Sequence, residues 1–254
     1  MLILLSPAKK LSIEGGKLTD FTLPKFTVAS GELIKELRKY SPKKLRQLMK
    51  VSTDIAELNV ERYAKWTENH TLEDAKQAVL AFTGEVYNGL QAAKFNDDEL
   101  NYTQQHLRIL SGLYGVLKPM DLIHEYRLEM GTKLKFKKYN NLYNFWGDKI
   151  VNELNDLLKT HQNKTIVNLA STEYFKAVNT KKLNGKVITP IFKDGKNGEY
   201  KVVMMYAKKA RGMMANYIIK NKLENTEDLI SFNMDGYYFN PKLSTENELV
   251  FYRN

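Results

Sequence analysis

The chain has 254 residues, of which 43% are apolar and 27% charged, a composition typical of a globular protein with a buried core. It contains no cysteine, which excludes disulfides, thiolate metal sites, iron–sulfur clusters and redox-active thiols. Lysine and arginine exceed aspartate and glutamate by 39 to 29, and the resulting net charge of +10 favours polyanionic partners such as nucleic acid.

No apolar run reaches the roughly 18 residues of a membrane span, and the apolar opening MLILL lacks the basic flank of a signal peptide. We therefore expect a cytoplasmic protein with no membrane contact. The four histidines are not spaced as metal ligands, so we expect no metal site and no cofactor. The length favours one domain, or one domain with a small appended module. We expect a single α/β domain over residues 1–254, with a central mixed sheet flanked by helices, and α+β as the alternative class.

The chain begins with an apolar run at residues 2–5, which predicts a strand buried on both faces. Ser6 and Lys9 follow at the carboxyl end of this strand, which is the end where open α/β sheets bind ligands. After a loop, an amphipathic helix is predicted over residues 30–40.

Residues 41–66 predict two short helices joined by a tight turn. Ser41 is a good N-cap, Pro42 a good first helical residue, and Ser52 a good cap for the second helix. The pair suits a helix-hairpin-helix, which would offer phosphates its backbone amides and the side chains of Lys43, Lys44 and Lys50. The usual hairpin of that motif carries glycines and this one carries none, so an ordinary helical pair is the alternative.

Helical periodicity continues over residues 72–95, although residues 78–82 could equally form a strand that stops at Thr83-Gly84. The acidic residues 97–99 are more typical of a helix start than of a metal site. Leucines at three- and four-residue spacing predict a buried helix over residues 106–117. Gly112 and Gly115 within it indicate that another backbone or a ligand approaches closely there.

Residues 126–130 alternate between apolar and charged side chains, which is the period of a strand. Arg127 would then lie between Glu125 and Glu129. Two interpretations stay open: a surface ladder of ion pairs, or an arginine held rigid at the floor of a cleft.

The second half of the chain alternates helices and strands. A helix is predicted over residues 150–158, then a strand over residues 165–170 and a helix that opens at Ser171. The remaining predictions are a hairpin of residues 187–192 and 199–206 turned by DGKNG, a helix over 208–220, a strand near 229–232, and pairing of 237–239 with 249–252.

The helix predicted over residues 208–220 would carry Lys208, Lys209 and Arg211 in its first turn, where the helix dipole opposes cations. Each such cation costs on the order of 0.3 to 1 kcal/mol, and a bound anion would offset that cost. The alternative is that these side chains simply extend into water.

Three predicted strand ends carry polar or cationic residues, near Ser6, Ser171 and Lys208. If these strands are parallel neighbours, the three sets meet in one electropositive cleft that Arg127 can face. No common nucleophile or nucleotide motif occurs in the sequence. For an enzyme acting in this cleft, the candidate catalytic residues are Ser6, Arg127, Glu129 and Ser171.

The chain resembles the YaaA family of bacterial peroxide-stress proteins over essentially its whole length. Seven ordered blocks carry the resemblance: LLSPAKKL, LAFTGEVYNGL, HLRILSGLYGVLKPMDLIHEYRLEMG, NFWGD, NLASTEYFKAV, YAKKARG and FNMDGYYF. The resemblance implies an α/β fold peculiar to the family, a helix-hairpin-helix, a positively charged cleft, and binding of duplex DNA. It also implies a role in limiting iron-driven oxidative damage under hydrogen peroxide.

Residues and resemblance together predict a stress protein that binds double-stranded DNA and limits iron-dependent oxidative damage. The alternatives are an enzyme acting on a phosphorylated or nucleic-acid substrate in the same cleft, and an iron-handling protein whose ligands come from separate segments. Nine cations are expected to hold phosphates: Lys9, Arg108, Arg127, Lys208, Lys209 and Arg211 in the cleft, and Lys43, Lys44 and Lys50 at the hairpin.

Overall fold

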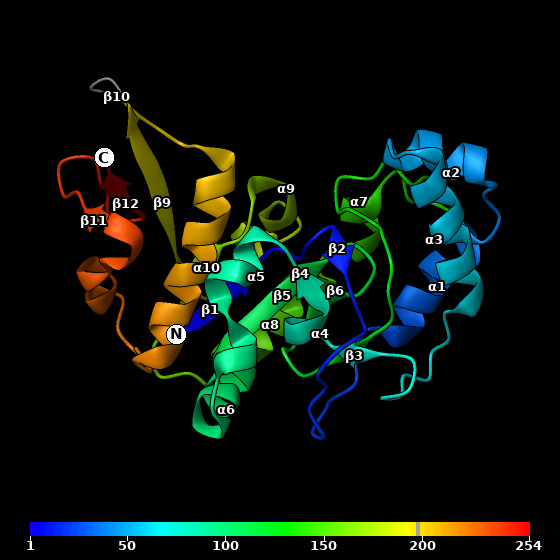
Figure 1. Ribbon diagram of the computed structural model, residues 1–254, viewed down its shortest axis with the longest axis horizontal. Helices are drawn as coiled ribbons and strands as arrows, with labels where there is room; N and C mark the ends of the chain where they lie inside the picture. The colour runs from blue at the N-terminus through cyan, green and yellow to red at the C-terminus, as the bar shows by residue number, and fades with distance from the viewer. Residues whose placement is uncertain (197–198) are drawn as a thin grey trace.

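An eight-stranded mixed sheet forms the centre of the computed structural model, which describes residues 1–196 and 199–254 (Figure 1). The strand order is β11-β12-β9-β8-β1-β5-β6, with β10 paired to β9. The bounds are β1 Leu2–Leu5, β5 Leu107–Ser111, β6 Gly115–Leu117, β8 Thr165–Leu169, β9 Lys186–Lys196, β10 Glu199–Lys201, β11 Tyr238–Phe239 and β12 Glu248–Arg253. Two small pairs lie outside this sheet: β2 Lys10–Leu11 with β4 Phe82–Thr83, and β3 Lys76–Gln77 with β7 Leu122–Ile123.

Ten α-helices surround the sheet in the described residues, which confirms the predicted α/β class with a central mixed sheet. Their bounds are α1 Thr27–Leu37, α2 Pro42–Met49, α3 Thr53–Lys65, α4 Ala78–Ala81, α5 Glu85–Leu90, α6 Asp97–His106, α7 Leu142–Trp146, α8 Lys149–Leu158, α9 Thr172–Phe175 and α10 Met204–Lys220. Short 3-10 helices occupy Ala92–Lys94, Thr180–Lys182, Glu227–Ser231 and Met234–Gly236.

The first strand, β1, lies at the middle of the sheet between β5 and β8 and is parallel to both. All four of its residues are buried, as the continuous apolar run predicted. Leu5 pairs with Leu169 at the carboxyl ends of β1 and β8, so the residues that follow these two strands emerge side by side. The parallel arrangement therefore holds for two of the three predicted strand ends. The third is wrong, because β10 ends at Lys201 and pairs antiparallel with β9, and Lys208 belongs to the helix α10.

The prediction of a helix over residues 106–117 is wrong. The helix α6 ends at His106, and residues 107–117 form the antiparallel hairpin of β5 and β6. The error arose because every residue of β5 is buried, so its leucine spacing reflects burial on both faces and not helical periodicity. The predicted close approach at Gly112 is confirmed: a Cβ there would lie 2.1 Å from the carbonyl oxygen of Leu128.

The strand predicted over residues 126–130 is absent from the described structure, although the alternation of buried and half-buried side chains holds from Glu125 to Met130. The helix predicted over residues 72–95 is broken into the short elements from β3 to the 3-10 turn at Ala92–Lys94. The strand predicted near residues 229–232 is a 3-10 helix.

The predicted starts of several helices are confirmed. Ser41 caps α2 with Pro42 at its start, and Ser52 caps α3. The helices predicted over residues 30–40 and 150–158 correspond to α1 and α8, and β11 pairs with β12. The DGKNG turn cannot be compared in full, since Asn197 and Gly198 lie outside the described residues.

The last helix, α10, begins at Met204, one turn before the predicted start. It packs against α5 and against β1, β8 and β9. Gly212 of α10 and Gly89 of α5 make this close crossing possible: a Cβ on Gly212 would lie 1.8 Å from the carbonyl oxygen of Val86, and one on Gly89 would lie 2.2 Å from that of Lys209. The crossing brings α10 over the carboxyl ends of β1 and β8.

Candidate functional site

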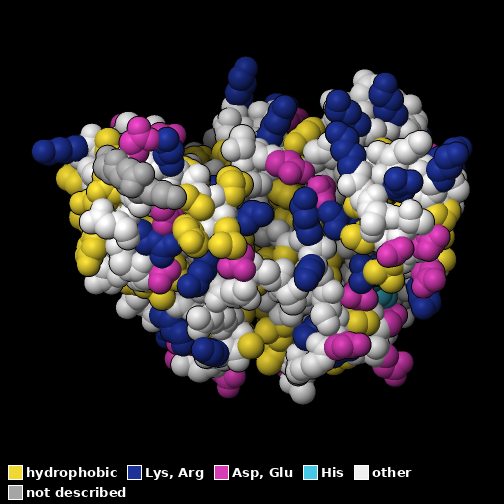
Figure 2. All heavy atoms as spheres, turned by 45° about the horizontal axis from the view of Figure 1, so that its top comes forward, with side chains coloured by type: hydrophobic (Ala, Val, Ile, Leu, Met, Phe, Trp, Pro, Cys, Tyr) yellow, Lys and Arg dark blue, Asp and Glu magenta, His cyan; other side chains and the backbone are white. Residues whose placement is uncertain are grey.

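A cavity of about 390 Å³ lies where the carboxyl ends of β1 and β8 meet α10, α5, α9 and the segment before Met130. Seven of the sequence-predicted site residues line it: Ser6, Lys9, Arg127, Glu129, Ser171, Lys208 and Arg211. Figure 2 shows a hollowed face of the molecule with lysine and arginine side chains on both sides of the hollow and carboxylates among them.

Ser6 and Ser171 are joined directly because the strands that precede them are in register. The backbone N–H of Ser171 donates to Ser6 Oγ at 2.8 Å, and the two hydroxyl oxygens lie 3.3 Å apart. The Tyr87 hydroxyl donates to the Ser6 carbonyl at 3.1 Å. Among the described residues no histidine or carboxylate hydrogen-bonds Ser6 Oγ, so neither serine has the adjacent base that activates a nucleophile.

Arg127 is held in the cavity wall by contacts on both its side chain and its backbone. Its Nη2 atom lies 2.8 Å from Glu129 Oε1, and Lys9 Nζ lies 3.4 Å from the same oxygen. The Tyr63 hydroxyl donates to the Arg127 carbonyl. The flanking Glu125 pairs with Arg62 and not with Arg127. This geometry agrees with the second interpretation in that Arg127 is fixed at a cleft, but Arg127 lies in the wall of the cleft and not at its floor.

Lys208 and Arg211 reach the cavity from the second turn of α10, not from its first turn as predicted. Their backbone amides therefore lie inside the helix, and the predicted conflict with free amides and dipole at the helix start does not arise. Arg211 is half-buried, and burial lowers the pKa of its guanidinium without any carboxylate acting to raise it. In the described part of the chain, neither Lys208 nor Arg211 has an acidic partner within salt-bridge distance.

Two cleft cations of the prediction lie elsewhere. Arg108 is 3% exposed inside β5 and donates through Nη1 to the carbonyls of Gln104 and Leu107, because β5 lies between β1 and β6 and all its residues are buried. Lys209 points away from the cavity and pairs with Asp235 at 3.5 Å. The structure therefore removes Arg108 and Lys209 from the set that meets in the cavity.

The lysines of the helix pair form a separate group. Lys43, Lys44 and Lys50 are exposed on α2 and its C-cap, on the opposite side of the molecule from α10 (Figure 1). Lys50 adopts the left-handed conformation, with φ 54° and ψ 52°, at the joint where the usual hairpin carries glycine. The helix pair exists, while its role as a helix-hairpin-helix stays a prediction.

Three carboxylates also line the cavity: Glu85, Glu129 and Glu173. Glu173 Oε1 accepts the backbone N–H of Gly131 at 2.8 Å, so its position is fixed by the loop opposite. Sequence reasoning missed Glu85 as a site residue because it lay inside a predicted long helix; Gly84, with φ +124°, is the break that brings it to the cavity.

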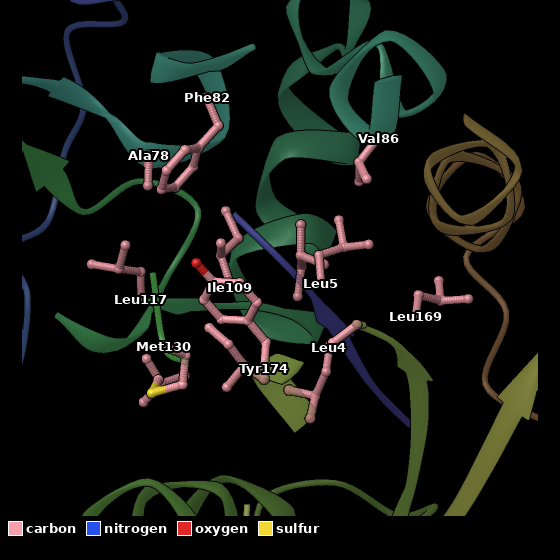
Figure 3. Close-up of a cluster of buried hydrophobic side chains, with 14 of the residues drawn as sticks. Leu4, Leu5, Ala78, Phe82, Val86, Ile109, Leu117, Met130, Leu169 and Tyr174 are labelled. Carbon is pink, nitrogen blue, oxygen red and sulfur yellow. The ribbon is translucent and has the colours of Figure 1, made fainter. Parts of the chain in front are cut away.

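The floor of the cavity is part of the hydrophobic core. Val86, Leu169 and Tyr174 line the cavity and also belong to the buried cluster beneath it (Figure 3). Burial raises the pKa of Tyr174 well above its usual value, so its hydroxyl is neutral. The site thus combines an apolar floor with charged and hydroxyl groups on its walls.

Two other features are absent from the described residues. No group of three or more histidine, aspartate or glutamate side chains is arranged to hold a metal ion. No described helix has both the length and the apolarity needed to cross a bilayer.

These features define a class of protein: a mixed α/β fold with a cation-bearing cavity at the carboxyl ends of two parallel strands. A family model described as "Peroxide stress protein YaaA" matches residues 1–243. A UPF0246 protein of Shewanella woodyi is 53% identical over 254 residues, which cover 100% of this chain and 99% of that protein. One from Aliivibrio fischeri is 52% identical over 254 residues, which cover 100% of this chain and 98% of that protein. The chain belongs to the YaaA family of peroxide stress proteins, as its seven sequence blocks indicated.

Proposed function

We propose that this protein binds double-stranded DNA and thereby limits iron-dependent oxidative damage during peroxide stress. The observation that carries the proposal is Arg211, a half-buried guanidinium without an acidic partner among the described residues, beside Lys208 and Arg127 in one cavity. A desolvated cation of this kind is costly until an anion joins it. DNA phosphates supply such anions, and the net charge of +10 favours their approach.

The phosphate contacts proposed in the cavity come from Lys9, Arg127, Lys208 and Arg211. Lys43, Lys44 and Lys50 of the helix pair supply a second set, as a helix-hairpin-helix would. Because the proposed ligand is DNA, we expect the protein to act in the cytoplasm.

DNA binding offers a physical route to protection from iron. A protein that neutralises phosphates displaces their condensed counterions, and Fe²⁺ held at the backbone is one such counterion. Displaced iron would react with peroxide away from the DNA. This route requires no iron site on the protein itself.

The test is fluorescence anisotropy on a duplex at two salt concentrations with the double variant Lys208→Ala/Arg211→Ala. Loss of two phosphate contacts should weaken binding by about 10- to 100-fold and reduce the slope of log affinity against log salt by about 1.8. The matched control is Lys164→Ala/Lys242→Ala, which removes the same charge; Lys164 immediately precedes β8, at the strand end opposite the cavity. Equal affinities for the two variants would remove the cavity from the DNA surface.

A second candidate is an enzyme acting on a phosphorylated or nucleic-acid substrate, favoured by the meeting of Ser6, Arg127, Glu129 and Ser171 in one cavity. Its test is turnover of nicked, 5′-phosphorylated and 3′-phosphorylated DNA by the wild type and by Glu129→Gln. Turnover that the variant abolishes would favour this candidate, whereas binding without turnover of any substrate would leave the DNA-binding proposal.

A further inference from the structure

The cavity has the wrong shape and composition for a site that holds only a DNA backbone. Ligand pockets in proteins span roughly 300 to 1,000 Å³, and at about 390 Å³ this one is near the lower limit. The major groove of B-DNA alone is about 12 Å wide, so a duplex can pass over the cavity mouth but cannot enter it. Whatever enters the cavity is a single small unit.

The apolar floor indicates that this unit has an apolar face. Val86, Leu169 and Tyr174 reach the cavity from the core (Figure 3). Leu128 and the ring of Tyr126 also line it and belong to the same buried cluster. A phosphate makes no use of apolar or aromatic walls. A nucleobase does, since its faces stack on such groups and its phosphate can remain with the cations of the rim.

The walls also offer polar groups for the edge of a base. The guanidinium-bearing Arg127 lines the cavity. The hydroxyls of Ser6 and Ser171 lie 3.3 Å apart on the same cavity. A guanidinium and two hydroxyls fit the mixed donors and acceptors that a base presents once it has left the stack.

The rim carries exposed apolar side chains where α10 begins. Met204 lines the cavity and is 59% exposed, and the adjacent Val203 and Met205 are 40% and 56% exposed. Apolar side chains beside a nucleic-acid site insert between base steps and hold a distorted strand open. Met204 is placed to occupy the gap left by a displaced base.

From these four observations we infer that the cavity receives one unstacked nucleotide of DNA, with its base on the apolar floor and its phosphate at Lys208 and Arg211. This inference rests on the proposed DNA-binding function and specifies which form of DNA the protein prefers. The preferred ligand is then DNA with an extrahelical or unpaired nucleotide, and the fully paired duplex is the weaker ligand.

The experiment compares three duplexes of one sequence by fluorescence anisotropy: fully paired, with a one-nucleotide adenine bulge, and with the same bulge made abasic. The two bulges share their backbone distortion and differ only in the base. We expect the adenine bulge to bind about tenfold or more tightly than the abasic bulge, as one stacked base provides. Equal affinities for the two bulges would overturn the inference, and this comparison needs no variant.

The variant Ala8→Trp tests the location, because Ala8 lines the cavity and is only half-buried. A tryptophan there fills the space, and the ratio of the two bulge affinities should fall towards one; Ala8→Ser, which fills nothing, should keep the ratio. A tenfold ratio that persists in Ala8→Trp would place the base elsewhere and contradict the inference. Absence of binding to all three duplexes would overturn the proposed function and the inference together, whereas binding without base preference would overturn the inference alone.

Discussion

Asp121 is a buried carboxyl whose surroundings set its protonation. It is 2% exposed, accepts from the Thr22 hydroxyl at 2.6 Å, and accepts from the Lys118 backbone N–H at 2.8 Å. Burial outweighs these hydrogen bonds and the nearby Arg108, and it raises the pKa of Asp121 from 3.8 to about 6. Burial also favours the neutral form of Arg108, because it lowers the pKa of that guanidinium to about 10.

We predict that Asp121 makes the protein less stable as pH rises from about 4 to about 6. Its pKa is higher in the folded than in the unfolded state, so the folded protein binds more protons in this window. At roughly 1.4 kcal/mol per pKa unit, the free energy of unfolding should fall by up to about 3 kcal/mol relative to Asp121→Asn. Urea denaturation of both proteins between pH 4 and 7 measures the difference. If the free energies of unfolding of the two proteins differed by the same amount at every pH in this window, the raised pKa of Asp121 would be contradicted. A constant difference is expected from the changed hydrogen bonds of Asp121→Asn alone, so only the change of the difference with pH is the test.

The crossing of α5 and α10 is the element-scale feature on which the cavity depends. Gly89 and Gly212 let the two backbones approach until no side-chain atom fits between them. If the distance between α5 and α10 were larger, Lys208 and Arg211 would lie farther from the carboxyl ends of β1 and β8.

We therefore predict that Gly212→Ala destabilises the protein, although alanine is favoured over glycine in a helix by about 1 kcal/mol. The new Cβ would lie 1.8 Å from a backbone oxygen, and only a shift of α5 can relieve this overlap. A net loss on the order of 1 to 3 kcal/mol is expected in urea denaturation. Gly16→Ala is the control, because a Cβ at Gly16 meets nothing within 4 Å. If Gly212→Ala and Gly16→Ala were equally stable, α5 and α10 could move apart at their crossing without loss of stability, and the prediction would be wrong.

The joint of α2 and α3 carries a strain that glycine would remove. Lys50 holds φ 54° without being glycine, a conformation that costs most residues about 1 kcal/mol. Lys50→Gly should raise the free energy of unfolding by about that amount, while Lys50→Ala keeps the strain and should not. Both variants lose the cation, so both should weaken DNA binding equally if Lys50 contacts a phosphate. Unchanged DNA affinity in both would exclude Lys50 from the interface.

Sequence reasoning succeeded where the determining chemistry is local. Ser41, Pro42 and Ser52 mark helix starts through hydrogen bonds made within three residues, and these signals need no tertiary information. It failed at residues 107–117 because the strand there is buried on both faces and its apolar residues do not alternate. It failed at the start of α10 because the first turn of that helix exposes apolar side chains, which hides the helical periodicity. The site followed the same division: Ser6 and Ser171 were predicted from strand ends, whereas the burial of Arg108 depends on both faces of β5 being covered, which is tertiary information.

At the scale of the whole molecule, two sets of cations flank the hollow face. Lys208 and Arg211 belong to α10 on one side of the molecule, and Lys43 and Lys44 belong to α2 on the other (Figure 1). Neither set has acidic partners within salt-bridge distance among the described residues. A duplex lying across the face would engage both sets at once.

This arrangement predicts additive salt dependence on a long duplex. Each phosphate contact contributes about 0.9 to the slope of log affinity against log salt, so Lys208→Ala/Arg211→Ala and Lys43→Ala/Lys44→Ala should each reduce it by about 1.8, and the four changes together by about 3.6. The measurement is anisotropy of a duplex of about 30 base pairs between roughly 50 and 200 mM salt. A Lys43→Ala/Lys44→Ala protein whose slope equals that of the wild type on the long duplex would show that the helix pair takes no part in binding.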